Sequence, residues 1–196
     1  MSHPERSPER DAAIMALLPF ADFDGWSIAA LKRAAGPDAD LLFPGGTLDL
    51  IEAYCDLGDR WMEAGAAAIA GTRVSERVRA IIALRLEQNE PYKGAVRRAL
   101  AVLAVPGHAL LASRCTVRTV DAIWHAAGDK SVDFSWYTKR AILAAVYGTT
   151  LLFWLQDGSE NGRRTLALLD RLLGAVGRIG GVRRRLSSAL GRLRPA

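Results

Sequence analysis

The sequence is poor in the residue types that most often carry catalysis or bind metals. It has three histidines and two cysteines, and neither set has the spacing of a metal site. It lacks a paired Glu-x-x-His motif and a serine nucleophile turn. Residues 44–47 (PGGT) lack the lysine that a phosphate-binding loop needs. We therefore expect a protein that is not an enzyme and uses no cofactor.

Long apolar runs are also missing. The longest uncharged run, residues 141–156, falls short of the roughly 20 residues that span a membrane as a helix, so we expect a buried core helix there. A second uncharged run, residues 99–113, is interrupted by Pro106 and Gly107. The start of the chain, MSHPERSPERD, is charged and proline-rich, and we expect no secretion signal in it.

Segments of alternating polarity are absent, whereas alanine, leucine and arginine are abundant and 50% of the residues are apolar. This composition predicts an all-α protein of 196 residues, with one domain or one domain plus an arm. Thr47 and Ser75 are expected to cap the helices that they begin. Helices are predicted at residues 11–20, 27–35, from 47 onward, 75–89, 93–105, 108–127, 135–156 and 162–173.

The two cysteines, Cys55 and Cys115, both fall in apolar, helix-patterned segments. Their spacing does not suggest a metal site. We interpret them as buried free thiols of a protein in a reducing compartment.

Charge is distributed unevenly along the chain, although the net charge is +5. Residues 1–63 hold 12 Asp and Glu but five Lys and Arg, whereas residues 171–196 hold seven arginines and no acidic residue. A negatively charged partner is therefore expected to meet the C-terminal tail first.

The first 65 residues resemble the tetracycline-repressor (TetR) type in the order of their elements: two helices, a short piece, the turn FPGG and a long helix. In such proteins the short piece enters the major groove and needs basic or polar groups. Here it carries Asp38 and Asp40, which Lys32 and Arg33 alone cannot outweigh. We expect a degenerate helix-turn-helix that is kept for packing and binds no nucleic acid.

Domains of this helical order often enclose an apolar cavity. Ordinary core packing and ligand contact both remain open for the side chains that could line one. These are Leu110, Leu111, Val120, Trp124, Tyr147, Leu151, Phe153 and Trp154.

Residues 133–140, DFSWYTKR, place Trp136 beside Tyr137 in a charged setting. Neighbours on a helix point about 100° apart, so the two aromatic rings cannot both face one core stripe. This segment is one of five short motifs that follow one another within about 50 residues: AGD, DFSWYTKR, LAAVY, WLQDGS and LDRLL. This order closely resembles the lipid-binding accessory family of ubiquinone biosynthesis, the ninth coenzyme Q protein.

The resemblance implies a TetR-like, homodimeric fold without DNA binding, holding a lipid or isoprenoid in its core. It also implies docking on membranes through a C-terminal amphipathic helix, and action with the di-iron demethoxyubiquinone hydroxylase. One of the two neighbouring aromatics would face the pocket mouth and the other a partner surface. The resemblance places Asp133, Trp136, Tyr137 and Arg140 beside the lipid opening, and we expect these four residues to bind the partner. For lipid binding we expect Trp136 and Tyr137 together with Trp124, Tyr147, Leu151 and Trp154, four of the side chains that could line a cavity. Asp133 is equally compatible with a simple helix cap.

The tail combines an apolar stripe with flanking arginines, a pattern typical of a helix in a membrane interface. A tail without fixed structure and a helix packed on a sister subunit remain alternatives, because glycines 174, 177, 180, 181 and 191 each disfavour a helix by about 1 kcal/mol. The candidate membrane-binding residues are Val176, Ile179, Val182, Arg183, Arg185, Leu186, Leu190 and Leu193.

Together these features predict three regions: a helix-turn-helix-like region at 1–65, a lipid-binding core at 66–173 and a membrane-binding tail at 174–196. The expected protein is an accessory of ubiquinone synthesis that presents quinone intermediates to the hydroxylase. It would act on an anionic membrane, at the cytoplasmic face of a bacterial inner membrane or the matrix side of the mitochondrial one. The rival hypotheses are a TetR-type ligand-sensing regulator and a plain helical scaffold.

Overall fold

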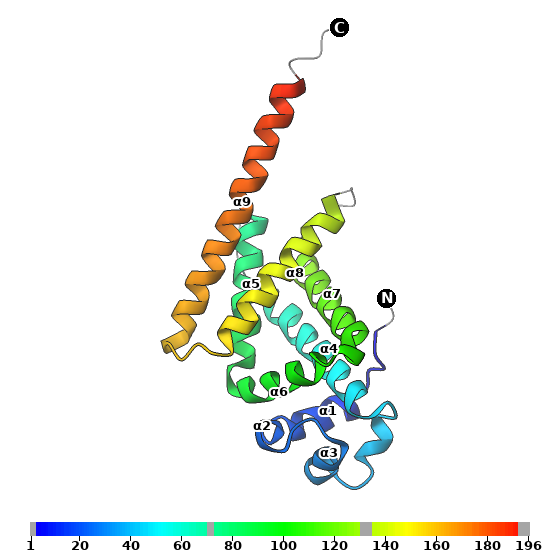
Figure 1. Cartoon of the computed structure of the whole chain (residues 1–196). Helices are drawn as coiled ribbons and strands as arrows, with labels where there is room; N and C mark the ends of the chain where they lie inside the picture. The colour runs from blue at the N-terminus through cyan, green and yellow to red at the C-terminus, as the bar shows by residue number, and fades with distance from the viewer. Residues whose placement is uncertain (1–2, 70–72, 130–134, 192–196) are drawn as a thin grey trace.

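The computed structural model describes residues 3–69, 73–129 and 135–191, and within the last range the side chains of residues 137–178. The regular structure of these residues is entirely helical, which confirms the all-α prediction (Figure 1).

The N-terminal region is a compact group of short helices. Ser7 and Ser27 begin two of them: each side-chain oxygen accepts a hydrogen bond from a backbone amide in the first turn, at 3.2 Å from Arg10 and 3.1 Å from Ala30. The elements are α1 (Pro8–Leu17), α2 (Ala21–Asp24), α3 (Ile28–Ala35) and the 3-10 helix η1 (Ala39–Leu42). Helix α1 packs on α3 and α4, and α2 packs on α6.

Two predicted caps are wrong. Helix α4 (Gly46–Ala66) begins one residue before Thr47, with Gly45 as its cap, because Gly46 turns the chain with a φ of 67°. The side chain of Asp49 accepts a hydrogen bond from the Gly45 amide at 3.3 Å instead. Helix α5 (Val74–Asn89) is capped by the backbone of Arg73, so Ser75 lies inside its first turn.

Helix α4 is the centre of the fold. It packs on α1, α5 and, most extensively, on α7 (Ala109–Ala126), and it buries Leu50, Ile51, Leu57 and Met62 almost completely. Helix α6 (Lys93–Leu103) lies between the 3-10 turns η2 (Glu90–Tyr92) and η3 (Pro106–His108). Trp26 ties the N-terminal region to this centre, because its Nε1 donates to the Ala95 carbonyl at 2.8 Å and its ring contacts Tyr54.

The last two helices are joined at a sharp corner. Helix α8 (Ser135–Trp154) leads through η4 (Glu160–Gly162) into α9 (Arg163–Gly191). The Asp157 carboxylate holds the corner by accepting from the Ser159 amide at 2.9 Å, from the Thr165 amide at 2.9 Å and from the Thr165 hydroxyl at 2.6 Å.

Helix α9 packs on α5 and α8, and its distal part extends away from the body (Figure 1). It continues without a break across residue 174, where the sequence led us to place a boundary.

No single helix in the described ranges is long and apolar enough to cross a membrane. One pair bent by 95°, Val74–Leu103 with Pro106–Ala126, passes the same test by length and composition alone. A buried helix of a protein core passes the test equally well, so this pair does not distinguish a membrane span from core helices.

Candidate functional site

An apolar cavity of about 290 Å³ lies where helices α4 to α8 meet. Its walls come mainly from α6, α7 and α8, whose apolar contributions are alanine, valine and leucine side chains. Leu152, 59% exposed, marks the place where the cavity meets the surface. The apolar lining residues are Val96, Ala99, Leu100, Leu103, Ala104, Ala112, Leu151 and Leu152.

One end of the cavity is polar. Here the Tyr54 hydroxyl donates to Asn89 Oδ1 at 2.8 Å, and Asn89 Nδ2 donates to the Arg85 carbonyl at 2.7 Å. Tyr147 lines the same end. Burial raises the pKa of both tyrosines above the ordinary value, so both hydroxyls keep their protons at neutral pH. Because the Tyr54 proton is already donated to Asn89, the Tyr147 hydroxyl is the tyrosine donor that this end can offer to a polar group on a bound molecule.

A buried ion pair lies under the polar end. Arg85 Nη2 is 3.2 Å from Asp59 Oδ1, and the two side chains expose only 7% and 5% of their surface. The Thr119 hydroxyl donates to both Asp59 oxygens, at 2.9 and 3.1 Å. Burial raises the pKa of Asp59 to about 6, against the opposing influence of Arg85.

Arg85 fits this place because Gly58 leaves room for it. A Cβ atom at Gly58 would lie 2.0 Å from Arg85 Nη1, closer than side-chain atoms can approach. Sequence reasoning missed Arg85, Tyr54 and Asn89 as cavity residues. A signal was available, because Arg85 and Asn89 occupy helical positions that continue the buried stripe of α5.

The predicted lipid-binding residues do not all meet at this cavity. Tyr147 and Leu151 line it. Trp124 lines neither this cavity nor the second hollow described next; it is half-buried, and Lys139 Nζ lies 6.0 Å from its ring centroid. Its indole N–H has no hydrogen-bond partner among the residues that the structure describes.

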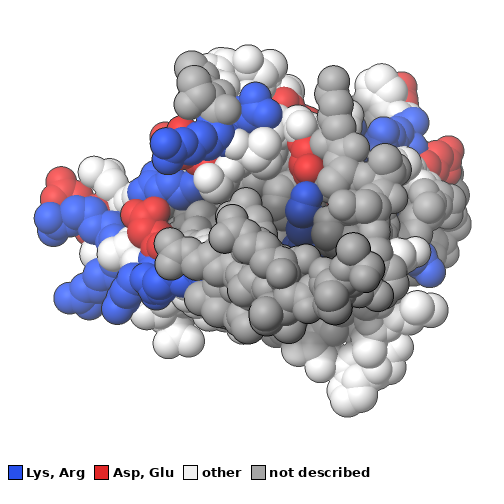
Figure 2. Space-filling model, turned by 90° about the horizontal axis from the view of Figure 1, so that it is seen from above, with Lys and Arg blue, Asp and Glu red and all other residues white. Residues whose placement is uncertain are grey.

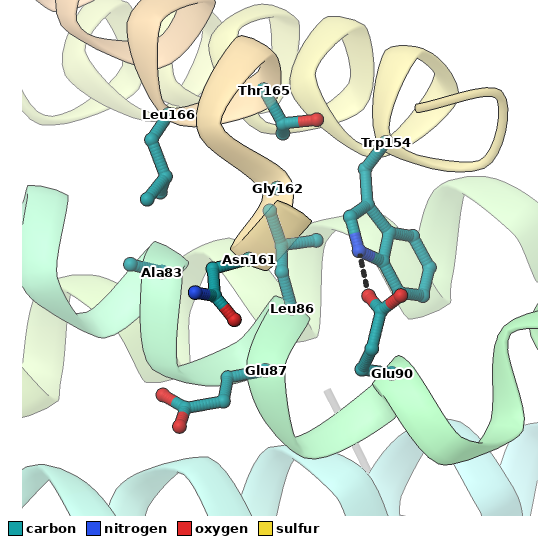
Figure 3. Close-up of a pocket in the computed structure, with 9 residues that line it drawn as sticks. All are labelled: Ala83, Leu86, Glu87, Glu90, Trp154, Asn161, Gly162, Thr165 and Leu166. Carbon is teal, nitrogen blue, oxygen red and sulfur yellow. Dashed lines mark hydrogen bonds between the residues drawn. The ribbon is translucent and has the colours of Figure 1, made fainter. Parts of the chain in front are cut away.

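Trp154 instead faces a second hollow, of about 390 Å³, between α5, the α8–α9 corner and α9 (Figure 3). Its Nε1 donates to Glu90 Oε2 at 2.7 Å, and Lys93 Nζ lies 4.8 Å from its ring centroid. These contacts fasten α8 to the end of α5, which is a structural role. Figure 3 shows the indole beside the carboxylate, with Asn161 and Glu87 further along the same hollow.

The DFSWYTKR patch is described in part. Tyr137 is 74% exposed, and the Arg140 guanidinium pairs with the Asp121 carboxylate, joining α8 to α7. Asp133 and the side chain of Trp136 lie outside the described residues. The partner role of this patch stays a prediction.

The tail is described to a similar extent. Val176 is half-buried and packs against the core. The side chains of Ile179, Val182, Arg183, Arg185, Leu186 and Leu190, and all of Leu193, lie outside the described residues. Membrane binding by these residues stays a prediction.

The helix-turn-helix-like region offers little free positive charge. Lys32 Nζ lies 3.0 Å from Asp40 Oδ2, and Arg33 Nη2 lies 3.0 Å from Asp24 Oδ2. The piece that would enter a DNA groove is the four-residue η1, where Leu41 is 78% exposed. Figure 2 shows the opposite side of the molecule, viewed from the distal end of α9, where the described Lys and Arg side chains lie near Asp and Glu side chains.

Part of the chain is similar to a known protein family. Residues 109–180, which include α7, α8 and the first half of α9, match the model of the COQ9 family. The chain is 38% identical over 98 residues to "Ubiquinone biosynthesis protein COQ9, mitochondrial" of Homo sapiens, covering 50% of this chain and 31% of the relative. The Drosophila melanogaster protein of that name is 44% identical over 85 residues, covering 43% and 26%. The matched part is thus about a third or less of these relatives.

One solved structure shares the architecture over most of the chain. It is described as a TetR transcriptional regulator from Nitrosomonas europaea, with a TM-score of 0.68 and 25% identity, covering 86% of this chain and 98% of that one. The resemblance drawn from the sequence is therefore confirmed: this chain is similar to the COQ9 proteins over residues 109–180, and its helices are arranged in a TetR-like fold.

Proposed function

We propose that this protein is a non-catalytic accessory of ubiquinone biosynthesis. It holds an isoprenoid or phospholipid in the cavity between α4 and α8, and presents quinone intermediates to the demethoxyubiquinone hydroxylase at a membrane. The similarity to proteins named for ubiquinone biosynthesis supports the proposed role in that pathway. The apolar cavity supports the proposed lipid binding.

The shape and polarity of the cavity are the observation that carries this proposal. Ligand sites are mostly apolar concavities of about 300–1,000 Å³ with a few polar groups that fix orientation. This cavity, at about 290 Å³, is at the small end, so it would hold a head group or part of a chain. The rest of an isoprenoid chain would extend out of the cavity past Leu152. Helices α7 and α8, which lie in the matched segment, contribute Cys115, Thr119, Tyr147 and Leu151 to the lining.

The tail supports the membrane part of the proposal by its sequence pattern. An apolar stripe with arginines on both sides would lie in the interface of an anionic membrane, each arginine adding about 1 kcal/mol. The relatives are named mitochondrial, and the corresponding place for this chain is the matrix side of the inner membrane or the cytoplasmic face of a bacterial one. The protein acts there as a homodimer, with Tyr137 and Arg140 on the surface offered to the hydroxylase.

Mass spectrometry of solvent extracts from purified protein, without added lipid, tests the central claim. We expect a stoichiometric isoprenoid or phospholipid from the unaltered chain. Ala112→Leu adds volume to the cavity wall from α7 and should remove the ligand. Ala109→Leu, the same change at an exposed position of the same helix, should retain it. An empty extract from well-folded protein would contradict the proposal.

The TetR-like architecture keeps one rival function in view, a ligand-sensing transcriptional regulator. A regulator should bind duplex DNA with an affinity that falls steeply with salt concentration. We expect no such binding, because Lys32 and Arg33 are already paired with Asp40 and Asp24. Specific DNA binding by the full chain would decide for the regulator.

A further inference from the structure

The two cysteines, 60 positions apart in the chain, face the same cavity. Cys55 lies on α4 and Cys115 on α7, the two helices that pack together most extensively. Both are free thiols. Cys115 exposes only 4% of its surface to solvent, so a reagent reaches it through the cavity.

The two thiols differ in their surroundings. Arg118 Nη2 lies 3.7 Å from Cys115 Sγ, and its side chain exposes 7% of its surface. The hydrogen bond with Cys55 and then the positive charge of Arg118 lower the pKa of Cys115. The same hydrogen bond, together with burial, raises the pKa of Cys55. The Arg118 guanidinium beside Cys115 Sγ favours the thiolate there, so Cys115 is the attacking thiol, and Cys55 lines the same cavity from α4.

We propose that Cys55 and Cys115 form a redox-active dithiol in the cavity wall, oxidised to a disulfide by a quinone bound in the cavity. The quinone as ligand class rests on the proposed function. The juxtaposition of the two thiols does not.

The chemistry balances with the quinone as oxidant. The Cys115 thiolate adds to a ring carbon, forming a C–S bond, and the electron pair displaced from the ring is protonated on a quinone oxygen. The Cys55 sulfur, once deprotonated, attacks Cys115 Sγ, so that the S–S bond forms and the C–S bond breaks. That electron pair returns to the ring, and the second oxygen takes a proton. Two thiols become one disulfide, and the quinone becomes a hydroquinone.

The disulfide would tie α4 to α7 in the wall of the cavity. It would persist until a reducing dithiol from solution restored the two thiols. The cavity would then differ between its reduced and oxidised forms in a covalent link between α4 and α7, added to the contacts that already join these helices.

The test uses the full, reduced chain and a ubiquinone analogue with a ten-carbon tail, in the absence of oxygen. We expect loss of both titratable thiols, a peptide linking α4 to α7 by a disulfide, and one hydroquinone per disulfide. Cys115→Ser should abolish the reaction. Cys55→Ser should stop at a covalent quinone adduct, because nothing is left to resolve it. Circular dichroism checks that both variants fold.

Two further oxidants separate the claim that the cysteines form a redox-active dithiol from the claim that a quinone in the cavity oxidises it. They are a water-soluble sulfonated benzoquinone and the small thiol oxidant diamide. Slow reaction with the sulfonated quinone supports access through the apolar cavity, whereas an equal rate with both quinones overturns it. A disulfide with diamide alone would keep the dithiol but remove the quinone as its partner, and would count against the proposed ligand. Absence of a disulfide with every oxidant would overturn the dithiol itself, leaving the lipid extraction experiment unaffected.

Discussion

Arg85 on α5 and Asp59 on α4 form an ion pair of 3.2 Å with almost no exposed surface, directly under the polar end of the cavity. Removing one partner of such a pair leaves an uncompensated buried charge, which costs about 3–5 kcal/mol. Arg85→Met should therefore lower the free energy of unfolding by roughly that amount, measured by urea denaturation.

The double variant Arg85→Met with Asp59→Asn is the matched control. It removes both charges, so it should be more stable than Arg85→Met alone. If the two changes simply add, the pair is not coupled, and the cavity floor is held by other contacts.

The raised pKa of Asp59 predicts a pH dependence with a definite sign. Its pKa of about 6 in the folded state lies above the usual value near 3.9, so folding binds a proton between these values. The contribution of this group to the free energy of unfolding is present at low pH and is lost as pH rises through about 6. Relative to Asp59→Asn, which does not titrate, the unaltered chain should lose stability from pH 4 to pH 7.

Carboxyl NMR shifts of Asp59 measure the same quantity directly. A midpoint near the ordinary aspartate value would show that the burial of this carboxylate is relieved in solution, and the pH dependence should then vanish as well.

Glycine 58 predicts a strong effect from a small change. A methyl group there would collide with the Arg85 guanidinium, so Gly58→Ala should destabilise the fold and disturb the ion pair. Gly148→Ala in α8 meets open space and should instead stabilise by about 0.5–1 kcal/mol through helix propensity. Thermal unfolding of both variants gives the comparison; equal effects would contradict the close packing at Gly58.

Replacing Trp154 or Trp124 by phenylalanine removes an indole N–H, and we expect the two changes to lower the free energy of unfolding by different amounts. Trp154→Phe removes the 2.7 Å hydrogen bond to Glu90, which is partly buried, and should cost about 1–2 kcal/mol for that bond in addition to lost packing. Trp124→Phe removes a donor without a partner among the described residues, so the loss of its N–H should cost little. Denaturant unfolding checks the difference. A larger cost at Trp124 would point to a partner beyond the described ranges.

Much of the fold was predictable from local pattern. Serine at position 27 and the apolar spacing of the following residues define α3, and breaks near Glu90, Pro106 and Gly128 separate the later helices. The order of the first 65 residues suggested the TetR-like arrangement, which the solved structure of that type supports.

The site was less predictable, because its polar end joins residues far apart in the chain. Asp59 meets Arg85 and Thr119 only once α4, α5 and α7 pack. A charged residue in a helix is ordinarily expected at the surface, so the position of Arg85 on the buried stripe of α5 was the one local sign of this pair, and it did not identify Asp59 as the partner. Trp154, expected to contact a ligand, lies at a second hollow and donates to Glu90, so its role in lipid binding stays a prediction.

Helix α9 has a mechanical consequence. Its first half is clamped to α5, where Arg79 Nε meets Asp170 Oδ1 at 2.7 Å, and the same helix continues to Gly191 without interruption. A membrane or protein that bound the far end of α9 would therefore set the orientation of the whole helical body. It would thereby also set the direction in which the cavity opening beside Leu152 points.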